Sequence, residues 1–145
     1  LYTDGTKIEC KISKSKGKPM KYLPEWARVG VLAIDERHDE FCEIAARLKA
    51  AKSDDEFLEV FCELYSHTVS HFKAEEDDMD GMEYPNSFEH KKEHEKALAE
   101  LDYFLDKTKN GKIFFARAFA KDRLDDWFKT HVLNMDSDLA RAMKL

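Results

Sequence analysis

Residues 53–75 read SDDEFLEVFCELYSHTVSHFKAE, and the order of apolar and polar residues in this stretch decides the fold. Ser53 and Glu56 form a capping box, the pattern with which many helices begin. Beyond it, the inward positions recur at steps of three and four residues, the period of one helix face. These positions are Phe57, Phe61, Leu64, Thr68, His71 and Glu75. The stretch therefore predicts a long amphipathic helix whose apolar face ends in a histidine and a glutamate.

The same period occurs in three further segments. The first begins near Ile34, and its inward positions are Ile34, His38, Phe41, Ala45 and Leu48. The next is expected to be capped by Ser87 and stopped by Asn110-Gly111; its inward positions are His90, His94, Ala97, Leu101 and Phe104. The last runs to about Met143, with Leu124, Phe128, His131, Met135 and Leu139 inward. Four such helices joined by short loops predict an all-α, up-down-up-down antiparallel four-helix bundle.

The composition agrees with such a bundle and excludes several classes of protein. With 145 residues, 37% of them charged and 43% hydrophobic, the chain is expected to be one soluble globular domain. A net charge of −6 without a dense basic stripe argues against a nucleic-acid partner. The apolar runs are far shorter than the roughly 20 residues of a membrane-spanning helix, so no membrane span is expected.

The N-terminal residues 1–23 differ from the rest of the chain. They are rich in lysine, and Ile8, Cys10 and Ile12 alternate with charged residues, which predicts one short strand. We expect residues 1–23 to be a non-helical arm or the tail of a preceding domain, and residues 24–145 to form the bundle. The three cysteines are widely spaced and suggest no disulfide framework, which favours a cytoplasmic location.

Five histidines and a glutamate occupy positions where a plain bundle would place leucine or isoleucine. They come from all four predicted helices, and they are His38, His71, Glu75, His90, His94 and His131. Burying so many polar groups without partners would cost several kcal/mol each, whereas a whole domain is stable by only about 5–15 kcal/mol. Metal ions on the bundle axis would resolve this conflict, because imidazole nitrogens and carboxylate oxygens would become ligands.

The spacing of these residues supports a shared metal site. His71 and Glu75 are four residues apart, as are His90 and His94, so each pair projects from one face of its helix. Asp136 follows His131 by five residues, and an ideal α-helix separates such positions by about 140°, which makes it the weakest candidate on spacing. Five imidazoles and two carboxylates suit two neighbouring ions with the carboxylates between them, and the absence of thiolates favours iron, manganese or zinc.

These residues, taken in order, resemble the bacterial hemerythrin-like domains of the hemerythrin family. The matching pieces extend from about Trp26 to Leu139: Val29-Gly30-Val31 before Ile34-Asp35-Glu36-Arg37-His38, then His71-Phe72-Lys73-Ala74-Glu75-Glu76 with Met79, Tyr84-Pro85, His90-x-x-x-His94, and Trp127-x-x-x-His131-x-x-x-x-Asp136. Each piece alone is common, but the complete ordered set is specific. The resemblance implies a four-helix bundle that binds dioxygen reversibly at two non-haem iron ions.

The resemblance also assigns the ligands. It implies that His90, His94 and His131 hold one iron, and that the other two histidines hold the second. Both carboxylates would bridge the irons together with an oxo or hydroxo group. Dioxygen would then bind at the iron with two histidines, beside an apolar wall that slows the escape of peroxide. The residues expected in this wall are Phe41, Phe72, Trp127, Phe128, Val132 and Met135.

Other polar residues near the ligands receive lesser roles. Glu76 faces about 100° away from Glu75 on an ideal helix and is expected to be solvated. His67 matches none of the family's ligands, so a surface or outer-shell position is expected. Asp35 is expected to be the N-cap of the first helix. Phe128 departs from the family, which usually has an aliphatic residue there, and a bulkier ring is expected to narrow the dioxygen pocket.

The residues leave more than one function open. A di-iron dioxygen-binding domain would act as a carrier or store, or as an oxygen-sensing or redox-sensing module attached to a signalling domain; the N-terminal arm and the non-Met start favour the sensor. The domain is not expected to be an enzyme, although weak peroxidase or nitric-oxide chemistry stays open. The alternative is an HD-type metal-dependent phosphohydrolase using His38-Asp39. A ferritin-like oxygenase is excluded because the sequence contains no Glu-x-x-His.

Overall fold

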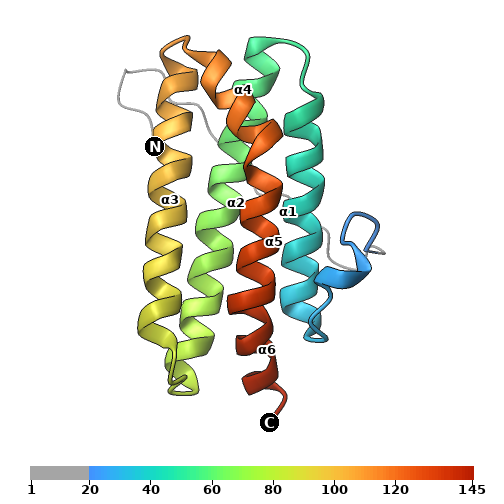
Figure 1. Ribbon diagram of the computed structural model, residues 1–145, viewed down its shortest axis with the longest axis vertical. Helices are drawn as coiled ribbons and strands as arrows, with labels where there is room; N and C mark the ends of the chain where they lie inside the picture. Colours follow the sequence, from blue (N-terminus) through green and yellow to red (C-terminus); the bar gives the residue numbers. More distant parts are fainter. Residues whose placement is uncertain (1–19) are drawn as a thin grey trace.

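The computed structural model describes residues 20–145, which form a bundle of four antiparallel helical columns (Figure 1). A short 3₁₀ turn, η1 (Glu25–Ala27), precedes the first column. The first three columns are single helices, α1 (Leu32–Ala50), α2 (Asp54–Gly81) and α3 (Ser87–Lys109). The fourth column consists of α4 (Ile113–Asp122), α5 (Leu124–His131), η2 (Val132–Asp136) and α6 (Ser137–Met143). The predicted all-α, up-down-up-down bundle is confirmed.

Local sequence signals explain where the long helices begin and end. Ser53 caps α2, because its hydroxyl accepts a hydrogen bond from the backbone N–H of Glu56 at 3.1 Å. At the end of α3, Gly111 adopts a φ of +80°, a left-handed conformation that costs a glycine little. One detail differs from the prediction: Asn86, and not Ser87, is the N-cap of α3.

The fourth column differs from the continuous helix that the sequence predicts. It breaks at Arg123, which has a φ of −122° and separates α4 from α5. It then widens into the π-helical turn η2 before continuing as α6. A π-turn contains one residue more than an α-turn, so the side chains beyond it face a different direction from the one that a 3.6-residue period predicts.

Two apolar clusters form the core, and the buried polar residues lie between them in sequence. The larger cluster contains Phe41, Leu64 and Phe128, whereas the smaller one contains Ile34 and Leu139. Along α1, α2 and the fourth column, the buried histidines and carboxylates follow one cluster and precede the other. The bundle therefore contains a polar layer enclosed at both ends by apolar side chains.

Two aspartates tie the segment before α1 to the bundle. Asp35 accepts hydrogen bonds from the backbone N–H groups of Val29 at 2.8 Å and Gly30 at 3.2 Å. The N-cap of α1 is Val31, so the prediction that Asp35 caps the helix is wrong, although Asp35 does bind backbone groups that precede it. Asp39 likewise accepts from the N–H groups of residues 22 and 23, at 2.7 and 2.8 Å. The predicted strand around Cys10 lies outside the described residues.

None of the helices formed by residues 20–145 combines the length and the apolar character of a membrane span. Cys42 has a free thiol, and burial raises its pKa to about 12. Cys62 is fully buried and disulfide-bonded, whereas the spacing of the cysteines suggested no disulfide framework.

Candidate metal centre

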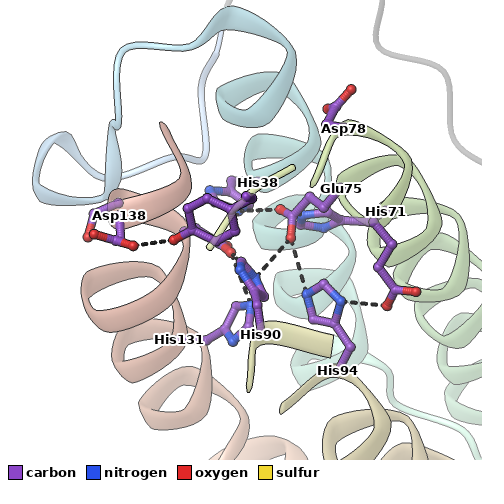
Figure 2. Close-up of polar contacts among 12 residues, drawn as sticks. His38, His71, Glu75, Asp78, His90, His94, His131 and Asp138 are labelled. Carbon is purple, nitrogen blue, oxygen red and sulfur yellow. Dashed lines mark hydrogen bonds and ion pairs between the residues drawn. The ribbon is translucent and has the colours of Figure 1, made fainter. Parts of the chain in front are cut away.

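Seven nitrogen-bearing or oxygen-bearing side chains converge in the polar layer of the bundle. They come from α1, α2, α3, α5 and η2, and none is more than 5% exposed. Figure 2 shows the imidazoles gathered around Glu75. The seven residues are His38, His71, Glu75, His90, His94, His131 and Asp136. The structure thus brings together every residue that the sequence nominates as a metal ligand.

The donors divide into two groups that share the carboxylates. In one group, Glu75 and Asp136 meet His90, His94 and His131; in the other, the same carboxylates meet the two remaining histidines. Within each group, the donor atoms all lie within 4.8 Å of one another. Each group is therefore compact enough to surround one metal ion.

Each carboxylate directs one oxygen toward each group. Glu75 Oε1 lies 3.1 Å from His94 Nε2, whereas its Oε2 lies 2.7 Å from His71 Nε2. Asp136 Oδ1 lies 3.0 Å from His90 Nε2, whereas its Oδ2 lies 2.8 Å from His38 Nε2. This division of oxygens is the arrangement that two bridging carboxylates require.

The donors of the three-histidine group face a common point and do not form hydrogen bonds with one another. The Nε2 atoms of His90, His94 and His131 have no hydrogen-bond partner, although carboxylate oxygens lie 3.0–3.4 Å away. Glu75 Oε1 and Asp136 Oδ1 are also unpartnered. A buried unsatisfied polar atom costs about 1–3 kcal/mol. A cation at the shared point would satisfy all five atoms, so these residues fit a metal ion.

The π-turn explains how Asp136 reaches the cluster. In a regular α-helix, Asp136 would lie about 140° around the helix from His131. Because η2 widens the helix between them, Asp136 Oδ1 instead lies 3.1 Å from His131 Nε2. Under an α-helical period this pair is the weakest candidate on spacing, and the extra residue of the π-turn removes that objection. Single π-turns are frequent at functional sites.

Electrostatics make the cluster strongly attractive to cations. Burial and the charge of Asp136 raise the pKa of Glu75, but His71 and His90 outweigh them and hold it well below its usual range. Burial likewise raises the pKa of Asp136, and His131 outweighs it. Burial lowers the pKa of His90, yet its closeness to both carboxylates raises it to about 9. The electrostatics of the metal-free cluster therefore favour two anionic carboxylates and a proton on His90.

Aromatic side chains fix the orientation of the imidazole rings. Phe72 stacks on His94, with ring centroids 3.7 Å apart and planes inclined by 5°. Trp127 stacks on His131 at 5.1 Å and 15°. Phe128 presents its ring to His38 at 5.3 Å and 85°, nearly perpendicular. These contacts restrict the rotation of the rings and keep their nitrogens aimed into the cluster.

A small cavity adjoins the two-histidine group. Its volume is about 10 Å³, which is near the size of one water molecule. His38 and His71 line it together with four of the six predicted wall residues, namely Phe41, Phe72, Trp127 and Phe128. The lining is completed by Thr68, His131 and Asp136. Val132 is buried in the larger apolar cluster, and Met135 lines a separate surface cleft, so neither borders this cavity.

Two polar residues lie near the cluster without belonging to its donor groups. His67 is only 3% exposed, and its Nε2 lies 3.1 Å from the carbonyl oxygen of Arg37. Burial lowers the pKa of His67 to about 4. Glu76, expected to be solvated, keeps 32% of its side chain exposed, and it also accepts a hydrogen bond from Nδ1 of His94 at 2.8 Å. The apolar period of α2 could not predict this contact, because the partner of Glu76 lies on α3.

The HD-type alternative lacks a residue that it needs. That type of site requires Asp39 as a ligand beside His38. Asp39 belongs to neither donor group, and its carboxylate binds backbone N–H groups that precede α1. The geometry therefore disfavours an HD-type phosphohydrolase.

Comparisons with known proteins identify the family. A family profile described as the hemerythrin HHE cation binding domain matches residues 29–143. A bacteriohemerythrin from Ralstonia nicotianae is 27% identical over 118 residues, which cover 81% of this chain and 85% of that protein. A bacteriohemerythrin from Clostridium acetobutylicum is 26% identical over 120 residues, which cover 76% of this chain and 91% of that protein. No solved structure gives a significant match. Since the profile spans most of the chain, including all seven residues of the polar cluster, this chain belongs to the hemerythrin family.

Proposed function

We propose that this chain binds dioxygen reversibly at a pair of iron ions held in the polar layer of the bundle. The proposed ligands of one ion are His90, His94 and His131. The proposed ligands of the other ion are His38 and His71, and both carboxylates of the cluster bridge the two ions, with an oxo or hydroxo group as the third bridge. Imidazole and carboxylate donors without thiolate suit non-haem iron.

The observation that carries this proposal is the unequal division of histidines between two groups that share their carboxylates. With the bridges in common, the ion with two histidines would have one protein ligand fewer than the other ion. It would therefore keep an open position for a small ligand. The cavity of about 10 Å³ adjoins this same group, so the open position would face a small space beside apolar rings.

The residues around the cavity are suited to protect such a ligand. Iron, when bound, supplies the electrons for reversible dioxygen binding. Phe41 and Phe128 stack on each other at 4.9 Å and line the cavity together with Phe72 and Trp127. Their apolar rings leave little space for water and offer no acidic proton. The rings thereby restrict the entry of water and the supply of protons. Both would favour the release of bound dioxygen in a reduced form.

The proposed physiological role is oxygen or redox sensing within a larger signalling protein, with carriage or storage as the other use of the same site. A ligand-dependent change in the packing of the four columns would then reach an attached domain. The domain is proposed to bind dioxygen without turning over a substrate.

The test is an anaerobic-to-aerobic spectroscopic titration of the iron-loaded protein. The reduced protein is expected to be nearly colourless under argon. Dioxygen should then produce near-ultraviolet charge-transfer bands that disappear again when the gas is removed. Bands that persist after prolonged removal of dioxygen, or the absence of any spectral change, would refute reversible binding. A His90→Ala variant, which lacks one proposed ligand, serves as the control without a complete site.

A further inference from the structure

Glu76 is a polar residue beside the cluster that the proposed ligand set does not use. Its Oε2 lies 2.8 Å from Nδ1 of His94, so the contact joins α2 to α3. Neighbouring acidic residues of α2 behave differently and pair with lysines at the surface: Asp77 lies 2.7 Å from Lys73. Glu76 therefore directs its carboxylate toward a proposed ligand, although 32% of its side chain is exposed and solvent is within reach.

The hydrogen bond determines which nitrogen of His94 faces the metal position. An ionised carboxylate only accepts hydrogen bonds, so Nδ1 of His94 must carry the proton. Nε2 is then unprotonated, and it is the atom that lies 3.1 Å from Glu75 Oε1 inside the cluster without a hydrogen-bond partner. Phe72 covers one face of the ring at 3.7 Å. The ring is thus held at its face and at Nδ1 while its lone pair points inward.

Two other imidazoles of the cluster lack such support. The Nδ1 atoms of His38 and His90 are buried and have no hydrogen-bond partner. A carboxylate on the outer nitrogen of a ligating histidine makes the ring a stronger electron donor, and such partners commonly affect metal affinity by about 10–100-fold. The negative charge of Glu76 therefore acts on the three-histidine group, through His94.

We propose that Glu76 is a positioning residue that fixes the tautomer of His94 and strengthens its bond to the metal ion of the three-histidine group. This inference rests on the proposed function, because it takes His94 to be a ligand. It predicts that the charge of Glu76 stabilises the more oxidised state of the iron pair, since a stronger donor favours the higher metal charge.

The experiment compares the wild type with Glu76→Gln, Glu76→Ala and the control Asp77→Asn. Glu76→Gln keeps a hydrogen-bond acceptor and removes the charge, whereas Glu76→Ala removes both. Asp77→Asn removes the same charge one residue along α2, from a carboxylate that pairs with Lys73. Zinc affinity is measured by chelator competition. The Nδ1–H resonance of His94 is followed by ¹⁵N-edited NMR of the zinc-loaded proteins, and the reduction potential is measured with iron.

Glu76→Ala is expected to bind zinc about 10–100-fold more weakly and to lose the slowly exchanging Nδ1–H resonance of His94. Glu76→Gln should keep that resonance but raise the reduction potential, and Asp77→Asn should match the wild type in all three measurements. The proposal is overturned if Glu76→Ala keeps wild-type zinc affinity and the His94 resonance, or if Asp77→Asn has the same effect as Glu76→Gln. A wild-type protein that takes up no pair of metal ions would instead refute the proposed function.

Discussion

Metal binding should displace a proton from the cluster, and the group that loses it should be His90. Its closeness to Asp136 and Glu75 outweighs burial and raises its pKa to about 9. At pH 7 the imidazole of His90 is therefore protonated in the metal-free protein. An imidazolium has no free lone pair, so the ring must release this proton before it binds a metal ion.

The size of the effect follows from the pKa. Two pH units below a pKa of about 9, displacement of the proton weakens the apparent metal affinity about 100-fold, or by about 2.7 kcal/mol. Affinity should thus rise about tenfold per pH unit between pH 7 and 9 and level off above that range. The stability of the metal-free protein should fall over the same pH range in which the metal affinity rises. Because the pKa of His90 is higher in the folded chain, its contribution to stability is complete below pH 6.5 and is lost as the pH rises through 9.

Isothermal titration calorimetry of zinc into the metal-free protein measures the released protons directly. Titrations at pH 7 in buffers of different ionisation enthalpy should give a release of about one proton per chain at the three-histidine group. Repeating them above pH 9.5 should reduce the release toward zero. An affinity that does not change between pH 7 and 9, with no proton released, would show that His90 is neutral in the metal-free cluster.

Three further predictions concern residues beside the ligands. Phe128→Leu should enlarge the cavity beside His38, lower the free energy of unfolding by about 1–2 kcal/mol and accelerate autoxidation in air; an unchanged autoxidation rate would contradict a protective role of the ring. His67→Ala should cost about 1–3 kcal/mol in denaturant unfolding through the lost hydrogen bond to the Arg37 carbonyl, yet keep two metal ions per chain; loss of metal would make His67 part of the site. Deleting Asn134 should convert the π-turn into an α-turn, in which Asp136 follows His131 by four residues and still faces the cluster, so metal content by elemental analysis should persist. Deleting Lys129 from the regular helix α5 should abolish metal binding. If the Lys129 deletion kept the metal and the Asn134 deletion lost it, the π-turn would not be what brings Asp136 to the cluster.

Much of the fold could be predicted because the helices obey simple local rules. The apolar period of residues 53–75 predicts the helix α2, and the Ser53 cap predicts where that helix begins. The four-residue spacing of His90 and His94 places both rings on one face of α3, where the structure has them. Buried polar residues at regular intervals also singled out the cluster, because an apolar core tolerates them only with partners.

The remaining features depend on relationships that periodicity does not express. The π-turn that ends at Asp136 adds a residue to the helix. A fixed period of 3.6 residues therefore places the Asp136 side chain too far around the helix from His131. Glu76 and His94 belong to different helices, so only the packing of α2 against α3 reveals their hydrogen bond. Asp39 belongs to neither donor group, and its bonds to the segment before α1 depend on the path of that segment.

If two metal ions share the carboxylates of the polar layer, anomalous diffraction from crystals of the iron-loaded protein should locate both of them. Data measured on both sides of the iron absorption edge should give two anomalous peaks per chain. One is expected among His90, His94 and His131 and the other beside His38 and His71, with Glu75 and Asp136 between them. A single peak, or a layer without iron, would show that the carboxylates are not shared by two ions.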